Sequence, residues 1–404
     1  MTVQWLIFAW RNTLRNRRRS LVTVALAALG TAAILIAGGF ALFTYRALAE
    51  DAARTTGHLV IAQAAQFDGD EDVPLQHGLS GPRALTDKLL DLPEVRHVLP
   101  RVDFSGLISN GEKSTVMLGY GVDPDAEFTI KGPFMSVTAG NVLTRGDTNS
   151  VVLGRGLARV LNAKVGSGLT LMATTTEGSL NAIDVKVKGI VDTGVPDIDL
   201  RLVYADITLA QRLLVTDKVS RIGIFLDRLD STSAVLPKVR ALVPGLTVKA
   251  WYELAPYYQS VRALYNRIFG ALGIIIAVIV VFVVVNAMAM AIIERTREVG
   301  SLRAMGTAPS LLTRLFAMEG LMLGAMGAVC GVVIALLVSL LLLEFPVQMP
   351  PPPGRSVGYP LQIAYDNYLY AITVLAMLVL AAVASALVAR RTVRLPIVDA
   401  LGHN

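Results

Sequence analysis

The chain has 404 residues and a formal net charge of +6, from 37 lysines and arginines against 31 aspartates and glutamates. Residues 46 to 266 contribute −2 (23 basic, 25 acidic) and the remaining residues +8 (14 basic, 6 acidic). The surplus arginines flank apolar runs, which assigns them to membrane topology and attraction to anionic lipid. No basic patch interleaved with aromatic residues occurs in the near-neutral segment, so the composition excludes a nucleic-acid-binding protein.

Residues 1 to 20 form a basic amphipathic segment, and residues 21 to 45 follow as a continuous apolar run. A signal-peptide core has about 7 to 15 apolar residues, so this longer run predicts a retained first membrane span. A cleaved signal peptide is the alternative, because three arginines (residues 17 to 19) precede the run and the ALA sequence at residues 47 to 49 imitates a cleavage site.

Residues 46 to 266 have the pattern of a large α/β domain, which must be held by its own core because the only cysteine, Cys330, allows no internal disulfide. A strand, an amphipathic helix and a second strand follow one another near both ends of this segment. We predict from this a split βαβ, ferredoxin-like subdomain over about residues 57 to 127 and 220 to 253. Short strands separated by turns predict an inserted, mostly β subdomain over about residues 128 to 219.

Three further apolar runs are each long enough for a helix to cross the membrane, which takes roughly 20 residues; they cover residues 268 to 293, 315 to 343 and 368 to 389. The predicted fold class is therefore an α-helical membrane protein with four transmembrane helices and a large extracytoplasmic α/β domain. Arginines cluster in residues 1 to 20, 294 to 314 and 390 to 404, which predicts that these three segments are cytoplasmic. The α/β domain and the short loop at residues 344 to 367 are then expected to lie outside. The sequence does not indicate a role for the proline run at residues 350 to 353.

The linker between the second and third spans has the features of a rigid docking helix. Glu294 and Arg297 lie one turn apart, Leu302 and Met305 give the helix one apolar edge, and Gly300 and Gly306 punctuate it. A charged element with an apolar edge suits a groove on another protein. A solvated loop beside the membrane is the alternative.

The third span carries a row of glycines, with spacings i, i+4, i+7 and i+11 that place them on one face of a helix. This face predicts a close packing seam with another helix, from the second or fourth span of the same chain or from a second subunit; its residues are Gly320, Gly324, Gly327 and Gly331. Glu319 lies near the cytoplasmic end of the span, where we expect its carboxylate to snorkel to water.

The sequence offers no catalytic or metal site. Residues 106 to 115 resemble a phosphate-binding loop, but no helix follows and the lysine is out of register, so a hairpin turn at Asn110 and Gly111 is expected instead. The four histidines, at 58, 77, 97 and 403, lack metal-ligand spacing. The acidic run from 68 to 72 lacks EF-hand spacing, so a solvated loop is favoured over a calcium site. No Walker motif is present, and the chain is not expected to be an enzyme.

The sequence ERTREVGSLRAMG at residues 294 to 306 resembles the signature of FtsX/MacB-type ABC transporter permeases. VVLGRGLA at 151 to 158, WYEL at 251 to 254 and the C-terminal ARRTVRLPIVDAL at 389 to 401 are also similar to family positions, as is the arrangement of one span, a large outside domain and three further spans. The resemblance implies that the linker is the coupling helix that seats on an ATPase, through Glu294, Arg295, Arg297, Glu298, Leu302, Arg303, Met305 and Gly306.

The resemblance also implies partners and a place in the cell. A permease without a fused ATPase domain would work with a separate ABC ATPase dimer that binds ATP and Mg²⁺, and with a second permease subunit, either a copy or a paralogue. It would reside in the bacterial inner membrane with its large domain in the periplasm, where a carrier or adaptor could bind. The lipoprotein-releasing (LolC/LolE-like) branch is the nearest, which implies a lipoprotein or lipid cargo moved by mechanotransmission. Peptide or drug efflux, and a non-transporting permease that activates an outside enzyme, are the alternatives.

Overall fold

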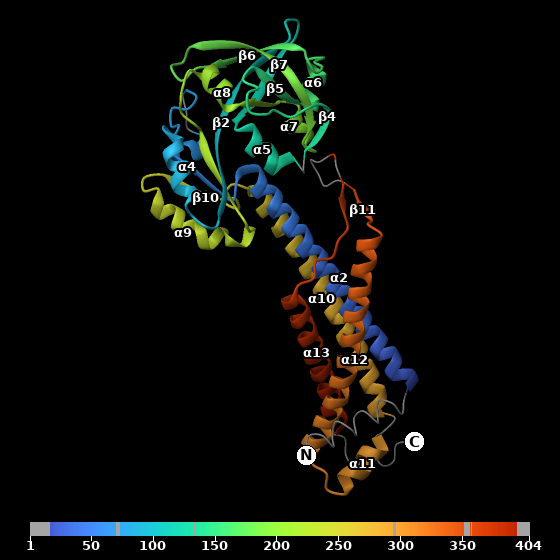
Figure 1. The fold of residues 1–404 in the computed structure, drawn as a ribbon. Coiled ribbons are helices and arrows are strands. Elements are labelled where there is room, and N and C mark those ends of the chain that lie inside the picture. Colours follow the sequence, from blue (N-terminus) through green and yellow to red (C-terminus); the bar gives the residue numbers. More distant parts are fainter. Residues whose placement is uncertain are drawn as a thin grey trace. The chain divides into compact units, whose positions relative to one another are not determined.

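The computed structural model describes residues 17–69, 73–132, 135–293, 296–350, 356 and 358–393. Most of the predicted N-terminal amphipathic segment, the last three residues of the acidic run, most of the proline run, and residues 394 to 404 of the predicted C-terminal tail lie outside these residues. The chain divides into two compact units (Figure 1), here called the helical unit (Met1–Arg46, Val261–Gln348 and Pro360–Asn404) and the α/β unit (Ala47–Ser260 and Met349–Tyr359).

Four helices in the described part of the chain are long and apolar enough to cross a membrane. They are α2 (Arg17–Thr56), α10 (Pro256–Ile293), α12 (Pro309–Glu344) and α13 (Asn367–Val393). The predicted number of spans is confirmed, and every helix is longer than the apolar run that predicted it. In particular, α2 continues without a break through residues 47 to 49.

Small side chains pack the helical unit together. One buried cluster joins Ala27 of α2, Ala328 of α12 and Ala381 of α13, with Val280 of α10 beside them. Alanine at such positions lets helix backbones approach closely, and this contact replaces the hydrophobic driving force that is missing between helices in lipid. The short helix α11 (Thr296–Ala304) connects α10 to α12.

The first sheet of the α/β unit has the strand order β10-β1-β9-β2, with every neighbouring pair antiparallel. Strands β1 and β2 therefore run in the same direction with β9 between them, and β9 and β10 run in the other direction with β1 between them. Helices α4 and α9 make the two crossovers. This is the interleaved split βαβ arrangement of a ferredoxin-like fold, as predicted; its elements are β1 (Leu59–Ala62), α4 (Pro82–Leu90), β2 (Val95–Ser109), β9 (Arg221–Leu226), α9 (Thr232–Leu242) and β10 (Thr247–Ala250).

The second sheet closes on itself. β2 pairs with β3, and the pairing continues through β8, β5, β7 and β6 back to β2, while β4 adds to the outside of β7. Closing a sheet into a ring reduces the number of unpaired strand edges. The strands are β3 (Ser114–Val122), β4 (Ser136–Gly140), β5 (Ser150–Gly154), β6 (Gly168–Thr174), β7 (Leu180–Asp192) and β8 (Leu202–Asp206).

The predicted boundary between the two subdomains differs from the structure. Residues up to 127 are predicted in the ferredoxin-like part, yet the second half of β2, from Val102, and all of β3 pair within the closed ring. The reason is the length of β2: its 15 residues are enough for one strand to serve both sheets. The inserted part also contains short helices: α5 (Pro124–Lys131), α6 (Arg155–Val160), α7 (Pro196–Asp199) and α8 (Ile207–Leu214).

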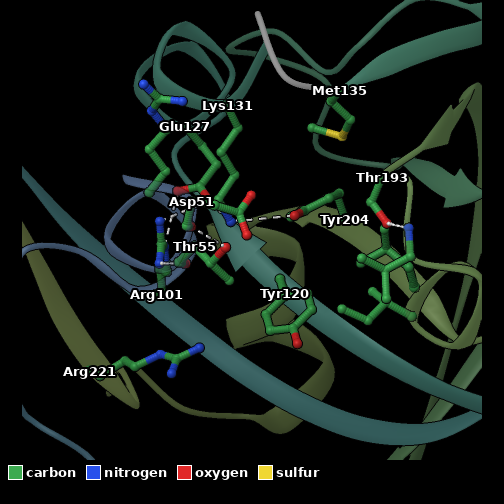
Figure 2. A pocket seen from close by; sticks show the side chains of 14 residues that line it. Asp51, Thr55, Arg101, Tyr120, Glu127, Lys131, Met135, Thr193, Tyr204 and Arg221 are labelled. Atoms are coloured by element: carbon green, nitrogen blue, oxygen red, sulfur yellow. Dashed lines mark hydrogen bonds and ion pairs between the residues drawn. The ribbon is translucent and has the colours of Figure 1, made fainter. Parts of the chain in front are cut away.

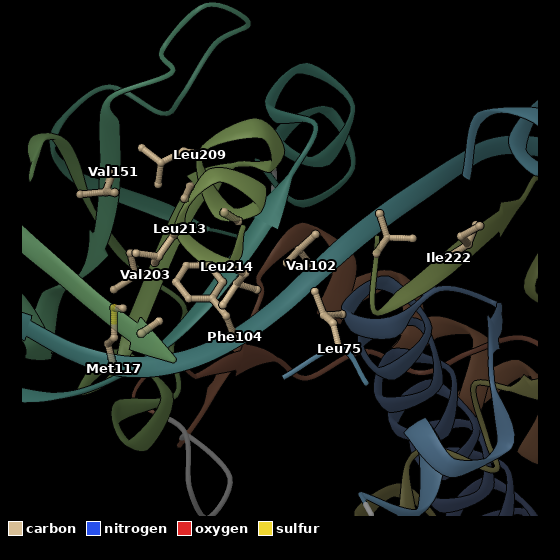
Figure 3. Packing of buried hydrophobic residues seen from close by; sticks show 14 of the residues in the cluster. Leu75, Val102, Phe104, Met117, Val151, Val203, Leu209, Leu213, Leu214 and Ile222 are labelled. Carbon is tan, nitrogen blue, oxygen red and sulfur yellow. The ribbon is translucent and has the colours of Figure 1, made fainter. Parts of the chain in front are cut away.

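Both sheets share one hydrophobic core, which includes Ile222 of the first sheet and Val203 of the second. Figure 3 shows Val102 and Phe104 of β2 within this core, with leucines of α8 close to Phe104. Burying one such side chain contributes about 1.5–3 kcal/mol, so the shared core makes separate unfolding of either part costly. The remaining described elements are α3 (Ala64–Asp68), η2 (Leu229–Ser231), β11 (Gln348–Met349) and β12 (Tyr359–Pro360).

Candidate functional site

The helix α11, between the second and third spans, is ended by Gly306. This glycine has a φ of +92°; its N–H donates to the carbonyl of Arg303, and the N–H of Thr307 donates to the carbonyl of Leu302, both at 3.0 Å. These are the two hydrogen bonds of a Schellman motif, which favours glycine because a positive φ costs it little. Gly300 lies inside the helix and does not interrupt it, so only Gly306 marks a helix end.

One face of α11 is buried in the helical unit. Val299 is 4% exposed and packs in a cluster with Leu312 and Phe316 of α12 and Ala389 and Val393 of α13. Val299 was not among the predicted coupling residues, although its position three residues before Leu302 places the two side chains next to each other on the helix surface. Val299 fixes the helix to the ends of two spans.

The face of α11 next to the buried one is open, and it continues into the turn after Ala304. Leu302 is 38% exposed and Met305 is 75% exposed, and Arg297 is exposed while Arg303 is half-buried. The predicted coupling residues Glu294 and Arg295 lie outside the described residues, and Glu298 lies in α11 with a side chain that is also outside the described part. Leu302 and Met305 thus form an exposed apolar edge near the exposed Arg297, while Val299 packs against α12 and α13.

The glycine row of α12 lies against two helices of the same chain. Gly320 and Gly324 approach Ser385 and Ala381 of α13, and a Cβ added at Gly324 would lie 2.6 Å from the Cβ of Ala381. Farther along α12, the partner is α2. A Cβ added at Gly327 would lie 2.5 Å from the Cβ of Ala27, and one added at Gly331 would lie 2.5 Å from the Cβ of Thr31. The first span was not among the expected partners. Eleven residues of helix extend about 16 Å, which gives room for two helices to share the row.

Glu319, beside this row, does not behave as predicted. Its side chain is 7% exposed within the helical unit, so the expectation that it snorkels to water is wrong. A carboxylate this deeply buried is stable only with partners, and Glu319 has an interaction in the structure.

A buried charge network in the α/β unit is absent from the predictions made from the sequence. Arg101, in β2, is 2% exposed; its Nε donates to Oε2 of Glu127 at 3.0 Å, and its Nη1 donates to the carbonyls of Thr55 (2.8 Å) and Thr56 (3.1 Å) at the end of α2. Lys131 lies 2.7 Å from Oε1 of the same glutamate. The i, i+4 spacing of Glu127 and Lys131 was a visible signal, whereas nothing local identified Arg101 as the third member.

The protonation of this network follows from burial and charge. Burial alone would raise the pKa of Glu127, but the positive charges of Arg101 and Lys131 outweigh it and hold the pKa below its ordinary value. Burial and then the charge of Arg101 lower the pKa of Lys131. Burial, and then the negative charge of Glu127, raise the pKa of Tyr204. Two cations therefore share one carboxylate in a poorly solvated place.

The remaining candidate sites resolve as structural features. Residues 106 to 115 form the hairpin between β2 and β3, in which Gly111 has a φ of +90° and the N–H of Asn110 donates to the carbonyl of Lys113. Among the described residues, no group of three or more histidine, cysteine, aspartate or glutamate side chains could hold a metal ion. His58 accepts a hydrogen bond from the N–H of Leu226 and lies edge-on to Phe225.

These features define a class: a protein with one membrane-spanning helix before a large α/β domain, three after it, and a short anchored helix between the second and third. The chain belongs to the family of ABC transporter permeases that combine a MacB-like periplasmic core domain, matched over residues 20–242, with an FtsX-like permease C-terminal domain, matched over residues 270–397. The first match alone covers more than half of the chain, and the predicted family is confirmed.

Individual relatives are more distant. The chain is 25% identical over 293 residues to the lipoprotein-releasing system transmembrane protein LolE of Haemophilus influenzae, a match that covers 68% of this chain and 70% of LolE. It is 31% identical over 201 residues to LolC of Neisseria meningitidis, covering 46% and 47% of the two chains. It is also 31% identical over 148 residues to the ABC transporter permease YtrF of Bacillus subtilis, covering 34% and 32%.

Solved structures show a weaker likeness. The periplasmic region of MacB from Actinobacillus actinomycetemcomitans aligns at 14% identity over 51% of this chain and 95% of that one, with a TM-score of 0.37. The extracellular domain of the transporter YknZ from Gram-positive bacteria aligns at 14% identity over 47% and 98%, with a TM-score of 0.34. Neither score is high enough to carry an argument about this chain.

Proposed function

We propose that this chain is the permease subunit of a mechanotransmission transporter, in which a separate ABC ATPase drives movements of the spans and of the α/β domain. The open face of α11 carries this proposal. Leu302 and Met305 expose an apolar edge, while Val299 ties the helix to α12 and α13, so a force applied to the open face acts directly on two spans. ATP and Mg²⁺ would be bound by the partner ATPase.

The proposed cargo is a lipoprotein or another lipid-anchored molecule. The names of two relatives, LolE and LolC, describe a lipoprotein-releasing system, and the matched model of a periplasmic core domain supports a large domain on the outer side of the inner membrane. We further propose that the transporter contains two permease subunits, with this chain paired with a copy or a paralogue.

Docking of the ATPase is tested by charging the apolar edge. The double variant Leu302→Glu with Met305→Glu should weaken binding of the ATPase at least tenfold, because few exposed apolar anchors carry most of the energy of an interface. Val160→Glu is the matched control, since Val160 is 41% exposed and lies in the α/β unit. Co-purification of the ATPase with each variant, expressed together and held in nanodiscs, is the measurement. Equal retention by the double variant and the control would show that α11 is not the coupling element.

Orientation is tested by labelling. Thr148 and Ser301 are both exposed in the structure, so a cysteine at either place is open to reagents once the compartment is reached. We expect an impermeant thiol reagent applied outside intact spheroplasts to label Thr148→Cys and to spare Ser301→Cys until the membrane is permeabilised. Immediate labelling of Ser301→Cys would contradict the proposed topology.

Hydrolysis is tested with the isolated chain. The purified permease should hydrolyse no ATP, and activity should appear only when an ABC ATPase subunit is added. Activity that remains with the permease through repeated purification, and that is unaffected by a catalytic variant of the ATPase, would refute the division of labour.

A further inference from the structure

The α/β unit contains a cavity of about 230 Å³, and the buried charge network forms one of its walls. In Figure 2, Arg101, Glu127 and Lys131 gather on one side of the cavity, Met135 and Thr193 lie on the other, and Tyr120 and Tyr204 stand between. Charged groups therefore line one end, and aromatic and aliphatic groups line the rest.

The lining at the charged end of the cavity contains more cations than carboxylates. It has four cations, Arg54, Arg101, Lys131 and Arg221, against two carboxylates, Asp51 and Glu127. Arg221 is already paired with Asp103, at 2.9 Å, and Arg54 with Glu50, at 2.8 Å. Arg101 and Lys131 share the single carboxylate of Glu127. A bound anion would relieve the repulsion between Arg101 and Lys131, which is one of the causes that lower the pKa of Lys131.

Lys131 is the group best placed to meet such an anion. Its ammonium has three donors, and the described structure uses two of them, for Glu127 at 2.7 Å and for the hydroxyl of Tyr204 at 3.4 Å. The side chain is 18% exposed, in contrast to 2% for Arg101 and 1% for Glu127. The third donor can therefore serve a ligand without breaking the network.

The other end of the cavity is apolar. Val195, Ile198 and Leu202 line it. The loop that carries Val195 is held in place, because Thr193 donates to Asp199 at 2.8 Å and the N–H of Gly194 donates to Asp192 at 2.8 Å. A preformed apolar wall opposite a few placed polar groups is the usual form of a small-molecule site.

Size restricts the occupant. Each enclosed water needs about 10–15 Å³ on this measure of volume, so the cavity holds on the order of fifteen waters or an organic group of similar bulk. A diacyl lipid anchor is too large to enter completely. A headgroup or a single short chain fits.

We propose that this cavity binds a small anionic amphiphile, with a carboxylate or phosphate at Lys131 and a short aliphatic chain along Val195, Ile198 and Leu202. The site would respond to movements of two segments, the end of α2 and the segment between α12 and α13. Asp51, Arg54 and Thr55 come from the last turns of α2, the helix that also contains the first span, and the N–H of Ser356, in the segment between α12 and α13, donates to the carbonyl of Gly194 at 2.8 Å. Occupancy is thereby linked to segments that continue into three of the four membrane helices.

The site is tested with octanoate, 1-octanol and inorganic phosphate, each added to the full chain in phosphatidylcholine nanodiscs. Binding is measured by calorimetry, with empty nanodiscs as the blank, and by protection of residues 50 to 57 from hydrogen exchange. We expect octanoate to bind at least tenfold tighter than 1-octanol, since the alcohol lacks the charge that meets Lys131, and to protect residues 50 to 57. Equal binding of octanol, or no binding of octanoate at millimolar concentration, would overturn the proposal. Phosphate binding as tightly as octanoate would instead assign the site to a free anion and refute the role of the chain.

Two variants separate a ligand site from a purely structural network. Lys131→Met should weaken octanoate binding about tenfold to hundredfold, the range for a lost charge-assisted hydrogen bond, whereas Lys113→Met, in the exposed hairpin, should leave it unchanged. Ile198→Trp fills the apolar end from a residue that is 43% exposed and therefore tolerant of change. It should abolish octanoate binding while the fold is retained. Undiminished binding in both cavity variants would show that octanoate binds elsewhere. This test needs no ATPase, so its outcome is independent of the proposed coupling through α11.

Discussion

Replacing Glu127 by glutamine is the sharpest test of how the α/β unit is held together. The carboxylate of Glu127 is the one partner that Arg101 and Lys131 share, at 3.0 Å and 2.7 Å, and it is 1% exposed. Glutamine keeps the shape of the side chain but removes the charge, and its amide group turns a donor towards two other donors. Arg101 cannot lose its proton in compensation.

The expected magnitude follows from burial. Removing one partner from a buried ion pair costs about 3–5 kcal/mol, because the other charge is left uncompensated. Because Lys131 is partly exposed to the cavity, the loss of stability expected for Glu127→Gln lies near the lower limit of this range, at about 3 kcal/mol. Arg145→Gln is the matched control: Arg145 pairs with Asp123 at 3.2 Å, but the two side chains are 75% and 36% exposed, and such surface pairs contribute about 0–1 kcal/mol.

Hydrogen exchange followed by mass spectrometry measures the difference locally, in the full chain and in nanodiscs. Arg101 also holds the carbonyls of Thr55 and Thr56, so the loss should be visible in peptides covering residues 50 to 57 and 95 to 104. A change of about 3 kcal/mol in the free energy of local opening corresponds to exchange on the order of a hundredfold faster. If Glu127→Gln accelerated exchange no more than Arg145→Gln does, the network would not be what joins α2 to the two sheets.

Three further outcomes follow from the structure. Gly324→Ala should destabilise the helical unit by about 1–3 kcal/mol through overpacking against Ala381, whereas Gly273→Ala, where an added Cβ meets nothing within 4 Å, should be neutral or stabilising in thermal unfolding. Gly306→Ala should cost about 1 kcal/mol and fray α11 in hydrogen exchange, since its φ of +92° is strained for alanine. Burial, and then Arg54, lower the pKa of His58 from 6.5 to about 4, so the unfolded state binds the extra proton and stability falls as pH drops from about 6.5 to 4. The loss should be about 1–2 kcal/mol after allowance for partial exposure, and His58→Asn should remove that part of the pH dependence; an unchanged pH profile would contradict the assignment.

Local patterns in the sequence determine much of this protein. Four apolar runs predicted four spans because crossing a membrane requires a length and a polarity that a single segment must supply by itself. The split βαβ halves were also predictable, since strand and helix periodicities are local and each half contains a complete strand, helix and strand. The linker at residues 294 to 306 was identified for the same reason, along with its open apolar edge.

What the sequence could not determine depends on residues far apart in the chain. Arg101 lies 26 residues from Glu127 and 45 to 46 from the helix end that it also binds, and a buried arginine looks like a surface arginine until its partners are placed. The predicted boundary between the two subdomains is wrong because the alternating strand pattern continues unchanged through Val102. Only the pairing shows that β2 lies next to β9 up to Arg101 and next to β3 from Val102 onwards. The glycine row predicted close packing but not its partners, since small residues permit an approach without specifying which helix makes it. Tertiary structure alone decided these points, because burying a charge or closing a sheet depends on distant groups arriving at the same place.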